Sequence, residues 1–539
     1  DHSASQSYTI KLPDNQIAAD KFLKVKSISG SGSTAIGQLE FADGGGGVTS
    51  DSQYNTVGGT NAGDSFSGTD ATKNSLFGYN AGTAITTGDN NSAVGYESLK
   101  SATTGSGNTV LGSEAMKDST SSLNNTAVGY QALSTATSCV YNVAVGWMAL
   151  GLTANGGNNT AIGAQAGEGV TSGENNVLVG RLAGTAITSG LKNTAIGSLS
   201  LDALSIGSET VAIGYKAGTS LTTTSQNTLI GAECAQAATT AHSLAGVGYK
   251  CFEQLTTGHS NAALGAFSLN NTTTGFYNVA VGHQALQYSQ SCKRNTAVGY
   301  KALGVADVSG DDNTAVGASA GEDITSGYRN TLVGYVAGQN ISNGQGNTIV
   351  GGDSGKAVTT GSLNVALGAF ALETLTSANS NVAIGYESLE MATTAGANTF
   401  VGRNSGGEVT TGNDNSGIGE NAGYTTTTGT NNTSLGHDSI ASSATASNEV
   451  TLGNASISAL RCNQTSISSL SDARDKTDII DIPVGIEFLN SLRPVKFKWQ
   501  RREPDLNDGL ERAGFIAQEL QEAQKNSEYL DLVMDNNPD

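Results

Sequence analysis

Basic residues and long apolar runs are scarce in this sequence. Its 539 residues include 27 Lys and Arg against 47 Asp and Glu, for a formal net charge of −20. With no Lys/Arg cluster to neutralise phosphates, we expect no nucleic-acid partner. Because no apolar run reaches the roughly 18 residues that a membrane-spanning helix needs, we also expect no membrane insertion.

Prolines are also rare, and all five lie near the two ends of the chain. Pro13 comes early, and the others are Pro483, Pro494, Pro504 and Pro538. Charged residues make up only 14% of the chain, and glycines number 71. This composition alone is compatible with disorder. A strict repeat in the proline-free part argues against disorder there, because a disordered segment need not keep a phase.

The repeat is marked by a glycine that recurs every 17 residues from Gly59 to Gly453, in 24 copies. Only two intervals differ, 19 residues from Gly59 to Gly78 and 18 from Gly299 to Gly317. So short a period predicts a solenoid, in which each coil buries its apolar face against its neighbours. We therefore expect a mostly β fold, a parallel β-roll or β-solenoid of 24 coils with about 17 residues per coil.

Each repeat has the pattern N-T-A-V-G-x-x-A-(G/L). Asn stands four positions before the glycine in 21 copies, and an aliphatic residue or Phe stands directly before it in 23. We expect a short strand, a turn at the glycine, a ladder of stacked Asn side chains and an aliphatic stripe in the core. The third position after the glycine is small, which predicts a thin interior. Because so thin a coil has little core, we expect three chains to pack side by side.

The chain divides into four parts on this basis. Residues 1–52 form a lead-in with strands expected at Tyr8–Leu12 and Phe22–Lys26, and residues 53–457 form the array. Residues 458–470 are a Ser-rich neck. Residues 471–539, in which 24 of 69 residues are charged, form a small α+β segment. The chain starts at Asp1 without a Met, so we expect the start to be processed or excerpted.

The cysteines fit the same register. Cys234 and Cys251 occupy the same small position in adjacent coils, close enough for a disulfide if coils stack about 4.8 Å apart. The simpler interpretation is that each replaces a buried Ala or Ser. Cys139 and Cys292 share another small position, and Cys462 in the neck can meet its copies in a trimer. No spacing indicates zinc, and we expect neither a metal nor a cofactor.

The N-T-A-V-G-x-x-A pattern resembles the head repeats of trimeric autotransporter adhesins and the repeat arrays of phage tail fibres. The resemblance covers about three quarters of the chain. It implies a left-handed, trimeric β-roll.

A second resemblance lies in the last segment, in two ordered blocks. These are S-D-x-R-x-K from Ser471 to Lys476 and G-F-I-A-Q-E from Gly514 to Glu519. They resemble the S74 peptidase family, the intramolecular chaperone domain of phage tailspikes, endosialidases and tail fibres. That domain drives trimerisation and then cuts itself off before the motif serine. The family domain usually continues into a helical tail, and this chain ends about 20 residues after the second block. We therefore expect a short or truncated domain.

Residue by residue, the family resemblance implies that Ser471 is the nucleophile, Lys476 the general base and Leu470–Ser471 the scissile bond. A serine hydroxyl becomes nucleophilic when a base takes its proton, and a lysine serves if burial or a neighbouring cation such as Arg474 lowers its pKa. Asp472 is expected to support the site. The alternative is that Ser471 only caps a helix and that Asp472 favours the positive end of its dipole. Single-turnover self-cleavage is the only catalytic activity we expect.

These features predict a structural adhesion fibre of a tailed phage, assembled in the host cytoplasm and carried in the virion tail. Expected partners are two further copies of the chain, other tail or baseplate proteins at the lead-in, and a glycan or protein receptor on the host. One alternative is a bacterial surface adhesin, disfavoured because neither a secretion signal nor a membrane barrel is found. Another is a polysaccharide-depolymerising tailspike, for which no recurring carboxylate pair is found.

A possible receptor-binding surface is the series of residues directly after the repeat glycines. Aromatic residues stand there repeatedly, for example Tyr79, Tyr96, Tyr130 and Trp147. An aromatic stripe can stack on sugars. The alternative is that these side chains pack between protomers or cover the rim of the rod.

Overall fold

The computed structural model describes residues 21–29, 36–43, 48–461, 485–498 and 510–525. It divides the chain into two units, Asp1–Ile457 and Ser458–Asp539. Near the N-terminus, β1 (Lys21–Ser29) and β2 (Ile36–Asp43) pair antiparallel. The strand predicted at Phe22–Lys26 is thereby confirmed, while the one predicted at Tyr8–Leu12 falls outside the described residues.

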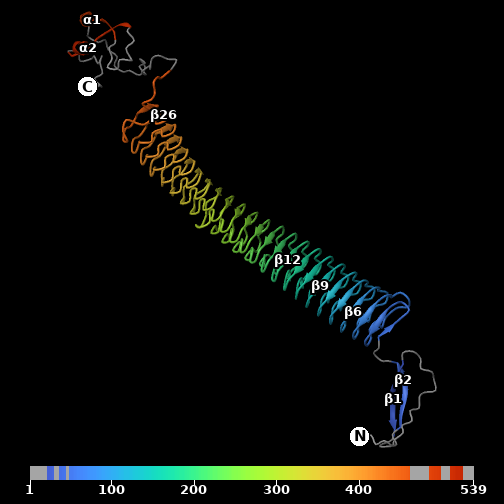
Figure 1. Cartoon of the computed structure of the whole chain (residues 1–539). Helices are drawn as coiled ribbons and strands as arrows, with labels where there is room; N and C mark the ends of the chain where they lie inside the picture. The colour runs from blue at the N-terminus through green and yellow to red at the C-terminus, as the bar shows by residue number, and fades with distance from the viewer. Residues whose placement is uncertain (1–20, 30–35, 44–47, 462–484, 499–509, 526–539) are drawn as a thin grey trace, which may run out of the picture. The chain divides into compact units, whose positions relative to one another are not determined.

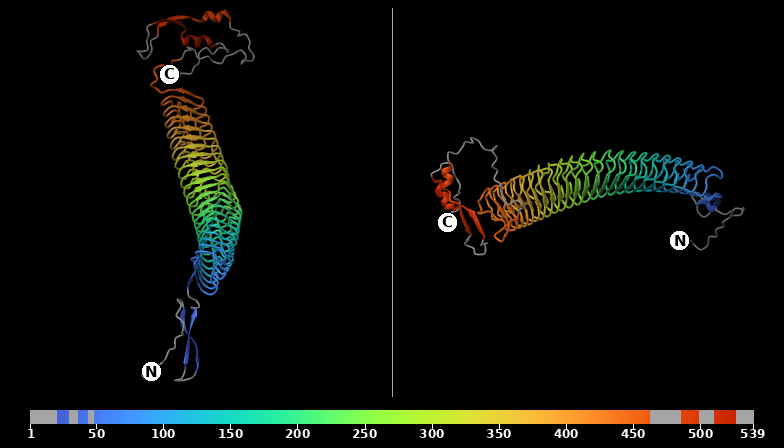
Figure 2. Two further views of the ribbon diagram at one scale, coloured as in Figure 1. Left: turned by 90° about the vertical axis from the view of Figure 1, so that its right-hand side faces the viewer. Right: turned by 90° about the horizontal axis from the view of Figure 1, so that it is seen from above.

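The predicted solenoid is present (Figure 1), and it forms one continuous, gently curved stack (Figure 2). A short β3 (Thr49–Ser50) pairs antiparallel with β4, and from β4 to β27 each strand pairs in parallel with the next. In β5 to β26 only the middle of the three residues is buried, and in β4 and β27 none is. The 24 strands enclose 23 turns. Their bounds are Thr56–Gly58, Ser75–Phe77, Ser92–Val94, Thr109–Leu111, Thr126–Val128, Val143–Val145, Thr160–Ile162, Val177–Val179, Thr194–Ile196, Val211–Ile213, Thr228–Ile230, Ala245–Val247, Ala262–Leu264, Val279–Val281, Thr296–Val298, Thr314–Val316, Thr331–Val333, Thr348–Val350, Val365–Leu367, Val382–Ile384, Thr399–Val401, Ser416–Ile418, Thr433–Leu435 and Val450–Leu452.

The repeat glycine is required by both the turn and the stacking. Gly95 has φ +141°, a backbone conformation that residues with a Cβ rarely adopt. A Cβ at Gly95 would also lie 2.3 Å from the carbonyl oxygen of Gly112 in the next coil. The same approach recurs along the array, so the glycine sets how closely the coils stack.

The predicted Asn ladder is confirmed as a hydrogen-bonded column, interrupted where Thr210 and Leu244 replace Asn. The backbone N–H of Asn108 donates to Oδ1 of Asn91 at 3.1 Å, and Nδ2 of Asn108 donates to the same atom at 3.0 Å. Nδ2 of Asn108 also donates to the carbonyl of Ser122, at 2.9 Å in the next coil. Asn91 and Asn108 are fully buried. Each Asn thus satisfies backbone groups that the thin coil would otherwise bury unpaired.

The predicted aliphatic core stripe is wrong by one position. In β6 and β7 the buried side chains are the middle ones, Ala93 and Val110, whereas Val94 and Leu111 before the glycine are 42% and 51% exposed. Side chains alternate between the two faces of a strand, so only one of two neighbours can point inward. In none of the 24 coils is the residue before the glycine buried.

The thin interior expected from the small residues is confirmed at the third position after the glycine. Ala81, Ser98 and Ala115 are fully buried there. The following position, for example Leu99 or Met116, is also buried and has a positive φ of 53° or 48°. This conformation explains why glycine often replaces the larger apolar residue at that position.

The second unit holds a small α+β arrangement in its described part, as predicted. Helix α1 (Ile486–Ser491) precedes β28 (Val495–Lys498), which pairs antiparallel with β29 (Glu511–Gly514), and α2 (Ala517–Gln524) follows. The G-F-I-A-Q-E block therefore spans the end of β29 and the first turn of α2.

Candidate functional site

The predicted cleavage site lies outside the described residues. Leu470, Ser471, Asp472 and Lys476 all fall within 462–484, so the proposed dyad stays a prediction from the sequence. The described part of this unit begins again at Gly485.

An ion pair connects the two described stretches of the C-terminal unit, 485–498 and 510–525. The Nε of Arg493, between α1 and β28, donates to Glu519 in α2 at 3.1 Å. This hydrogen bond to the guanidinium lowers the pKa of Glu519 below its ordinary value. No described residue of this unit is buried, and Ile486, Leu489 and Phe515 are 70%, 61% and 48% exposed. Two short helices and two strands are too few to enclose a core without further contacts.

A continuous apolar surface runs along the solenoid on the outer face of the strands. We call it the outer stripe and define it as the residues directly before the repeat glycines, from Phe77 to Leu452. Side chains within it that are 37–53% exposed include Val94, Leu111, Ile162, Ile196, Val247, Leu264, Leu367, Ile418, Leu435 and Leu452. Large exposed apolar patches are uncommon on monomeric proteins, so the outer stripe is a candidate interaction face.

The aromatic residues after the glycines project to the surface. Tyr79, Tyr96, Tyr130 and Trp147 are each 47–50% exposed. The rings of Tyr79 and Tyr96 stack at a centroid distance of 5.6 Å with 8° between their planes. Each of these two rings thus covers one face of the other, which leaves less ring surface for a sugar. Whether this series contacts a receptor stays a prediction.

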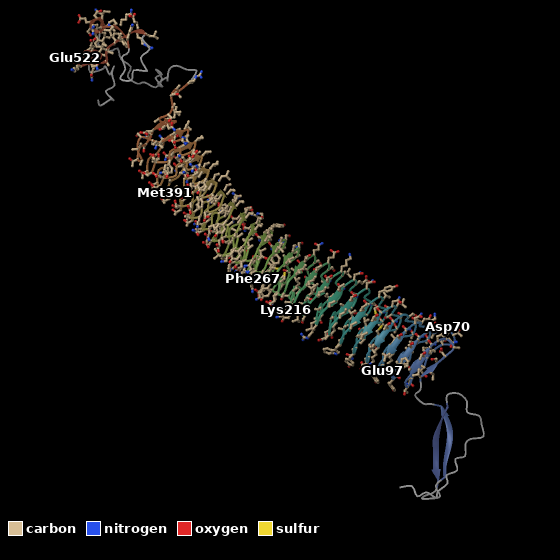
Figure 3. All side chains as sticks on the ribbon, in the orientation of Figure 1. Asp70, Glu97, Lys216, Phe267, Met391 and Glu522 are labelled. Atoms are coloured by element: carbon tan, nitrogen blue, oxygen red, sulfur yellow. The ribbon has the colours of Figure 1, made fainter. Side chains whose placement is uncertain are left out.

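A second surface, the polar edge, consists of the side chains two and five positions after each repeat glycine. Glu97, Lys216 and Phe267 belong to it, and Figure 3 shows them along one edge of the solenoid. Glu97 bonds to Lys100 at 2.8 Å and to Lys117 of the next coil at 3.1 Å. Hydrogen bonding to Lys100, assisted by Lys117, lowers the pKa of Glu97 to about 2. The polar edge was not predicted from the sequence; the signal that reveals it is the recurrence of opposite charges at these two positions.

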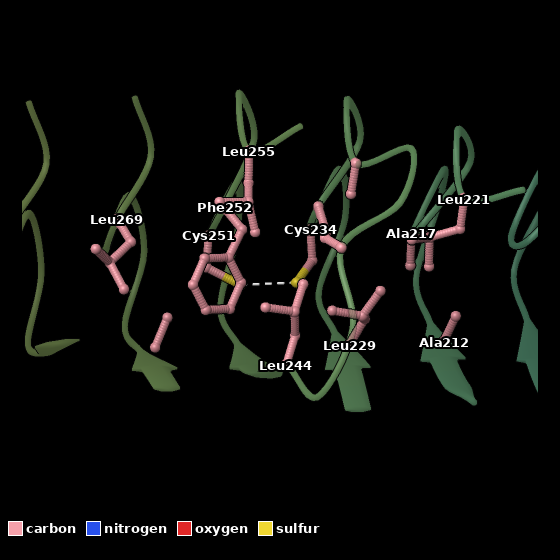
Figure 4. Packing of buried hydrophobic residues seen from close by; sticks show 14 of the residues in the cluster. Ala212, Ala217, Leu221, Leu229, Cys234, Leu244, Cys251, Phe252, Leu255 and Leu269 are labelled. Atoms are coloured by element: carbon pink, nitrogen blue, oxygen red, sulfur yellow. Dashed lines mark hydrogen bonds between the residues drawn. The ribbon is translucent and has the colours of Figure 1, made fainter. Parts of the chain in front are cut away.

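Four cysteines fill the small inward positions that the register predicts. Cys139, Cys234, Cys251 and Cys292 are fully buried and free. The sulfur atoms of Cys234 and Cys251 lie 2.8 Å apart across adjacent coils, beside Phe252 and Leu244 (Figure 4). Burial raises the pKa of the Cys234 thiol well above its ordinary value. In the structure these residues therefore act as small apolar core residues; Cys462 lies outside the described residues.

No candidate metal or membrane site emerges from the described parts of the chain. In these ranges no three His, Cys, Asp or Glu side chains gather in a way that could hold a metal ion. Likewise, no helix among the described residues is long and apolar enough to cross a membrane.

Comparison with known proteins identifies the last segment. Residues 471–528 match the family model described as the chaperone of endosialidase (peptidase S74). The match begins at Ser471, the residue predicted as the nucleophile. No curated protein and no solved structure matches the chain. The C-terminal match and the β-solenoid of about 17 residues per turn together fit a tail fibre with a C-terminal chaperone domain.

Proposed function

We propose that this chain is the shaft of a homotrimeric adhesion fibre of a tailed phage. Its C-terminal chaperone domain assembles three copies and then cuts itself off between Leu470 and Ser471. The observation that carries this proposal is the outer stripe, an apolar surface repeated in coil after coil that a lone chain leaves in water. Its combination with a chaperone-family segment supports an assembled fibre.

The energetics of the outer stripe favour association. Completing the burial of a half-exposed Val, Leu or Ile contributes about 1 kcal/mol, half of what full burial gives. The ten most exposed members named above would contribute roughly 10 kcal/mol per chain, and three chains roughly 30 kcal/mol. Association costs about 4–15 kcal/mol in lost translational and rotational freedom for each joining event. The free energy from burying the outer stripe is thus comparable with the entropic cost of the two association steps that form a trimer.

Other partners fit the two ends of this fibre. The lead-in, residues 1–52, would join the shaft to other tail or baseplate proteins, and the shaft would hold the receptor-binding surface away from the particle. The receptor would be a glycan or protein of the host surface. The fibre would assemble in the host cytoplasm and function in the virion tail.

The maturation step is an acyl transfer followed by hydrolysis. The Oγ of Ser471 would attack the carbonyl carbon of Leu470 while Lys476, in its neutral amine form, takes the hydroxyl proton. This proton passes to the leaving amine of Ser471, which becomes the new N-terminus. Water then hydrolyses the Leu470 ester, which restores the hydroxyl. Asp472 would hold the segment in place.

The test compares the full chain with Ser471→Ala and Lys476→Ala on a denaturing gel after expression. We expect two bands from the parent and one full-length band from each variant. Ser468→Ala, three residues before the motif serine, is the matched control and should give the parental pattern. If the parent and both variants gave the same bands, Ser471 and Lys476 would not be the nucleophile and base of the cleavage.

A further inference from the structure

The polar edge opens into a groove near the C-terminal end of the solenoid. The groove spans the coils of Gly402, Gly419 and Gly436 and has a volume of about 430 Å³. This volume falls within the range of roughly 300–1,000 Å³ that is typical of small-molecule sites. The residues that line it are Arg403, Asn404, Asn421, Tyr424, Thr425, Asp438 and Ile440.

Small residues at the fifth position after the glycine stand on both sides of Tyr424 in the groove. The fifth position after the glycine is Lys in the coils of Gly95, Gly112 and Gly351. In the first and last of these, Lys100 and Lys356 pair with acidic residues at the second position. In the groove region the fifth positions are Gly407, Tyr424 and Ala441. A Cβ at Gly407 would lie 2.9 Å from Cε2 of Tyr424, so this glycine makes room for the ring.

Three polar residues of the groove, Asn404, Asn421 and Asp438, stand at the second position after their glycines. The Oδ1 of Asn404 is buried and accepts no hydrogen bond. The backbone N–H of Asn404 is satisfied by the carbonyl of Tyr386 at 2.9 Å, so the unpaired atom belongs to the side chain alone. Nδ2 of Asn421 donates to Oδ1 of Asp438 at 2.8 Å, and Oδ2 of Asp438 lies 3.0 Å from Nδ1 of His437, while 45% of the Asp438 side chain stays exposed. The Oδ1 of Asn404 is closed to solvent, so the accessible polar groups of the groove are those of Asn421 and Asp438.

The charges around the groove disfavour an anionic ligand. The guanidinium of Arg403 is paired with Glu420 through a 3.0 Å bond from its Nε. Asp438 adds a negative charge, and the imidazole Nδ1 of His437 lies 3.0 Å from it. Arg403 and Glu420 offset each other, and the half-exposed carboxylate of Asp438 disfavours a carboxylate or phosphate beside it.

Apolar surface lies beside these polar groups. The side chain of Tyr424 is 37% exposed and that of Ile440 is 45% exposed. A partly exposed tyrosine ring next to amide and carboxylate groups offers a hydrophobic platform with convergent hydrogen-bonding atoms. A sugar ring has an apolar C–H face, which can pack on the tyrosine ring, and hydroxyl groups around its edge, which can hydrogen-bond to the amide and carboxylate groups.

We propose that this groove binds a neutral saccharide, with one hexose unit against Tyr424. The half-exposed carboxylate of Asp438 accepts hydrogen bonds from its hydroxyls, and Asn421 and Thr425 offer further polar contacts. This inference rests on the proposed adhesion function and gives it a site and a ligand class. The groove lies on the polar edge rather than on the outer stripe.

The experiment titrates methyl glycosides of glucose, galactose, mannose and N-acetylglucosamine into the full chain, followed by ligand-observed NMR. Sialic acid serves as the anionic probe. We expect at least one neutral glycoside to bind and sialic acid not to bind. Tyr424→Ala and Gly407→Lys, which refills the groove as in other coils, should each weaken binding at least tenfold. Lys356→Ala, a polar-edge variant outside the groove, should leave binding unchanged.

The inference is overturned if no neutral glycoside binds, if sialic acid binds better, or if Tyr424→Ala and Gly407→Lys bind as the parent does. Native mass and the two-band gel are measured on the same samples. If trimer and cleavage persist while saccharide binding fails, only the saccharide site is wrong. If trimer and cleavage are also absent, the proposed function itself has failed.

Discussion

The Asn ladder gives the sharpest structural prediction, because a single substitution disconnects two neighbouring coils. Nδ2 of Asn330 donates to Oδ1 of Asn313 at 3.1 Å and to the carbonyl of Gly344 at 2.9 Å. Oδ1 of Asn330 accepts from the backbone N–H of Asn347 and from its Nδ2, both at 3.0 Å. Asn330→Ala removes these four bonds and keeps the bond from its own backbone N–H to Asn313.

The magnitude follows from the groups left unpaired. Two backbone groups, the Gly344 carbonyl and the Asn347 N–H, lose the side-chain partner that the structure gives them in a fully buried column. Leaving a buried donor or acceptor unsatisfied costs about 1–3 kcal/mol. We therefore expect Asn330→Ala to lower the free energy of unfolding by roughly 2–6 kcal/mol per chain.

Two assays check this prediction. Chemical denaturation followed by far-UV circular dichroism reports the free energy of unfolding, and hydrogen exchange reports the Asn347 amide directly. Ser326→Ala is the matched control, because Ser326 is exposed in the same coil. We expect faster exchange at Asn347 in Asn330→Ala only. Equal unfolding midpoints and equal protection in the two variants would refute the account of the ladder.

Further predictions address the glycine column, the buried thiols and the polar edge. Gly214→Ala should be severely destabilised in thermal unfolding, because φ is +141° and a Cβ would lie 2.4 Å from a carbonyl oxygen of the next coil; Gly352→Ala, with nothing within 4 Å, should melt near the parent. Burial raises the pKa of the Cys139 and Cys292 thiols, so a maleimide at pH 8 should label them only after denaturation, and labelling in the folded state would contradict their burial. Because the pKa of Glu97 is lowered from 4.5 to about 2, its stabilising contribution is complete above pH 4.5 and is lost as the pH falls through 2. Glu97→Gln should therefore flatten the loss of stability over that acid range, and an unchanged profile would count against the ion pairs.

The solenoid could be predicted from the sequence because the structure requires certain residues at the same position of every coil. The glycine that permits the turn also admits the carbonyl of the next coil, and the Asn before it satisfies buried backbone groups in both coils. Neither residue can be exchanged freely, so both recur in register. The small residues and the four inward cysteines were predictable for the same reason, since the interior is thin.

The outward orientation of the aliphatic residue could not be predicted in this way. In a three-residue strand such as Ser92–Val94, inward and outward positions differ by one residue, and the larger apolar side chain looks like the core residue. The thin coil instead takes Ala93 inside and leaves Val94 for another surface.

The groove near Tyr424 escaped sequence analysis for a different reason. The small residues Gly407 and Ala441 on either side of Tyr424 are recognisable as a feature only once the polar edge of the other coils is known. The predicted dyad was accessible from the sequence only by resemblance, because Ser471 and Lys476 carry no periodic signal.

The most direct test of the central claim, a trimeric shaft released by self-cleavage, is native mass spectrometry of the purified protein. The parent should give a complex of three chains that each end at Leu470. Ser471→Ala should give a complex at three times the full chain mass of 54.4 kDa. A folded monomer, in which the outer stripe stays exposed to water, would contradict the claim.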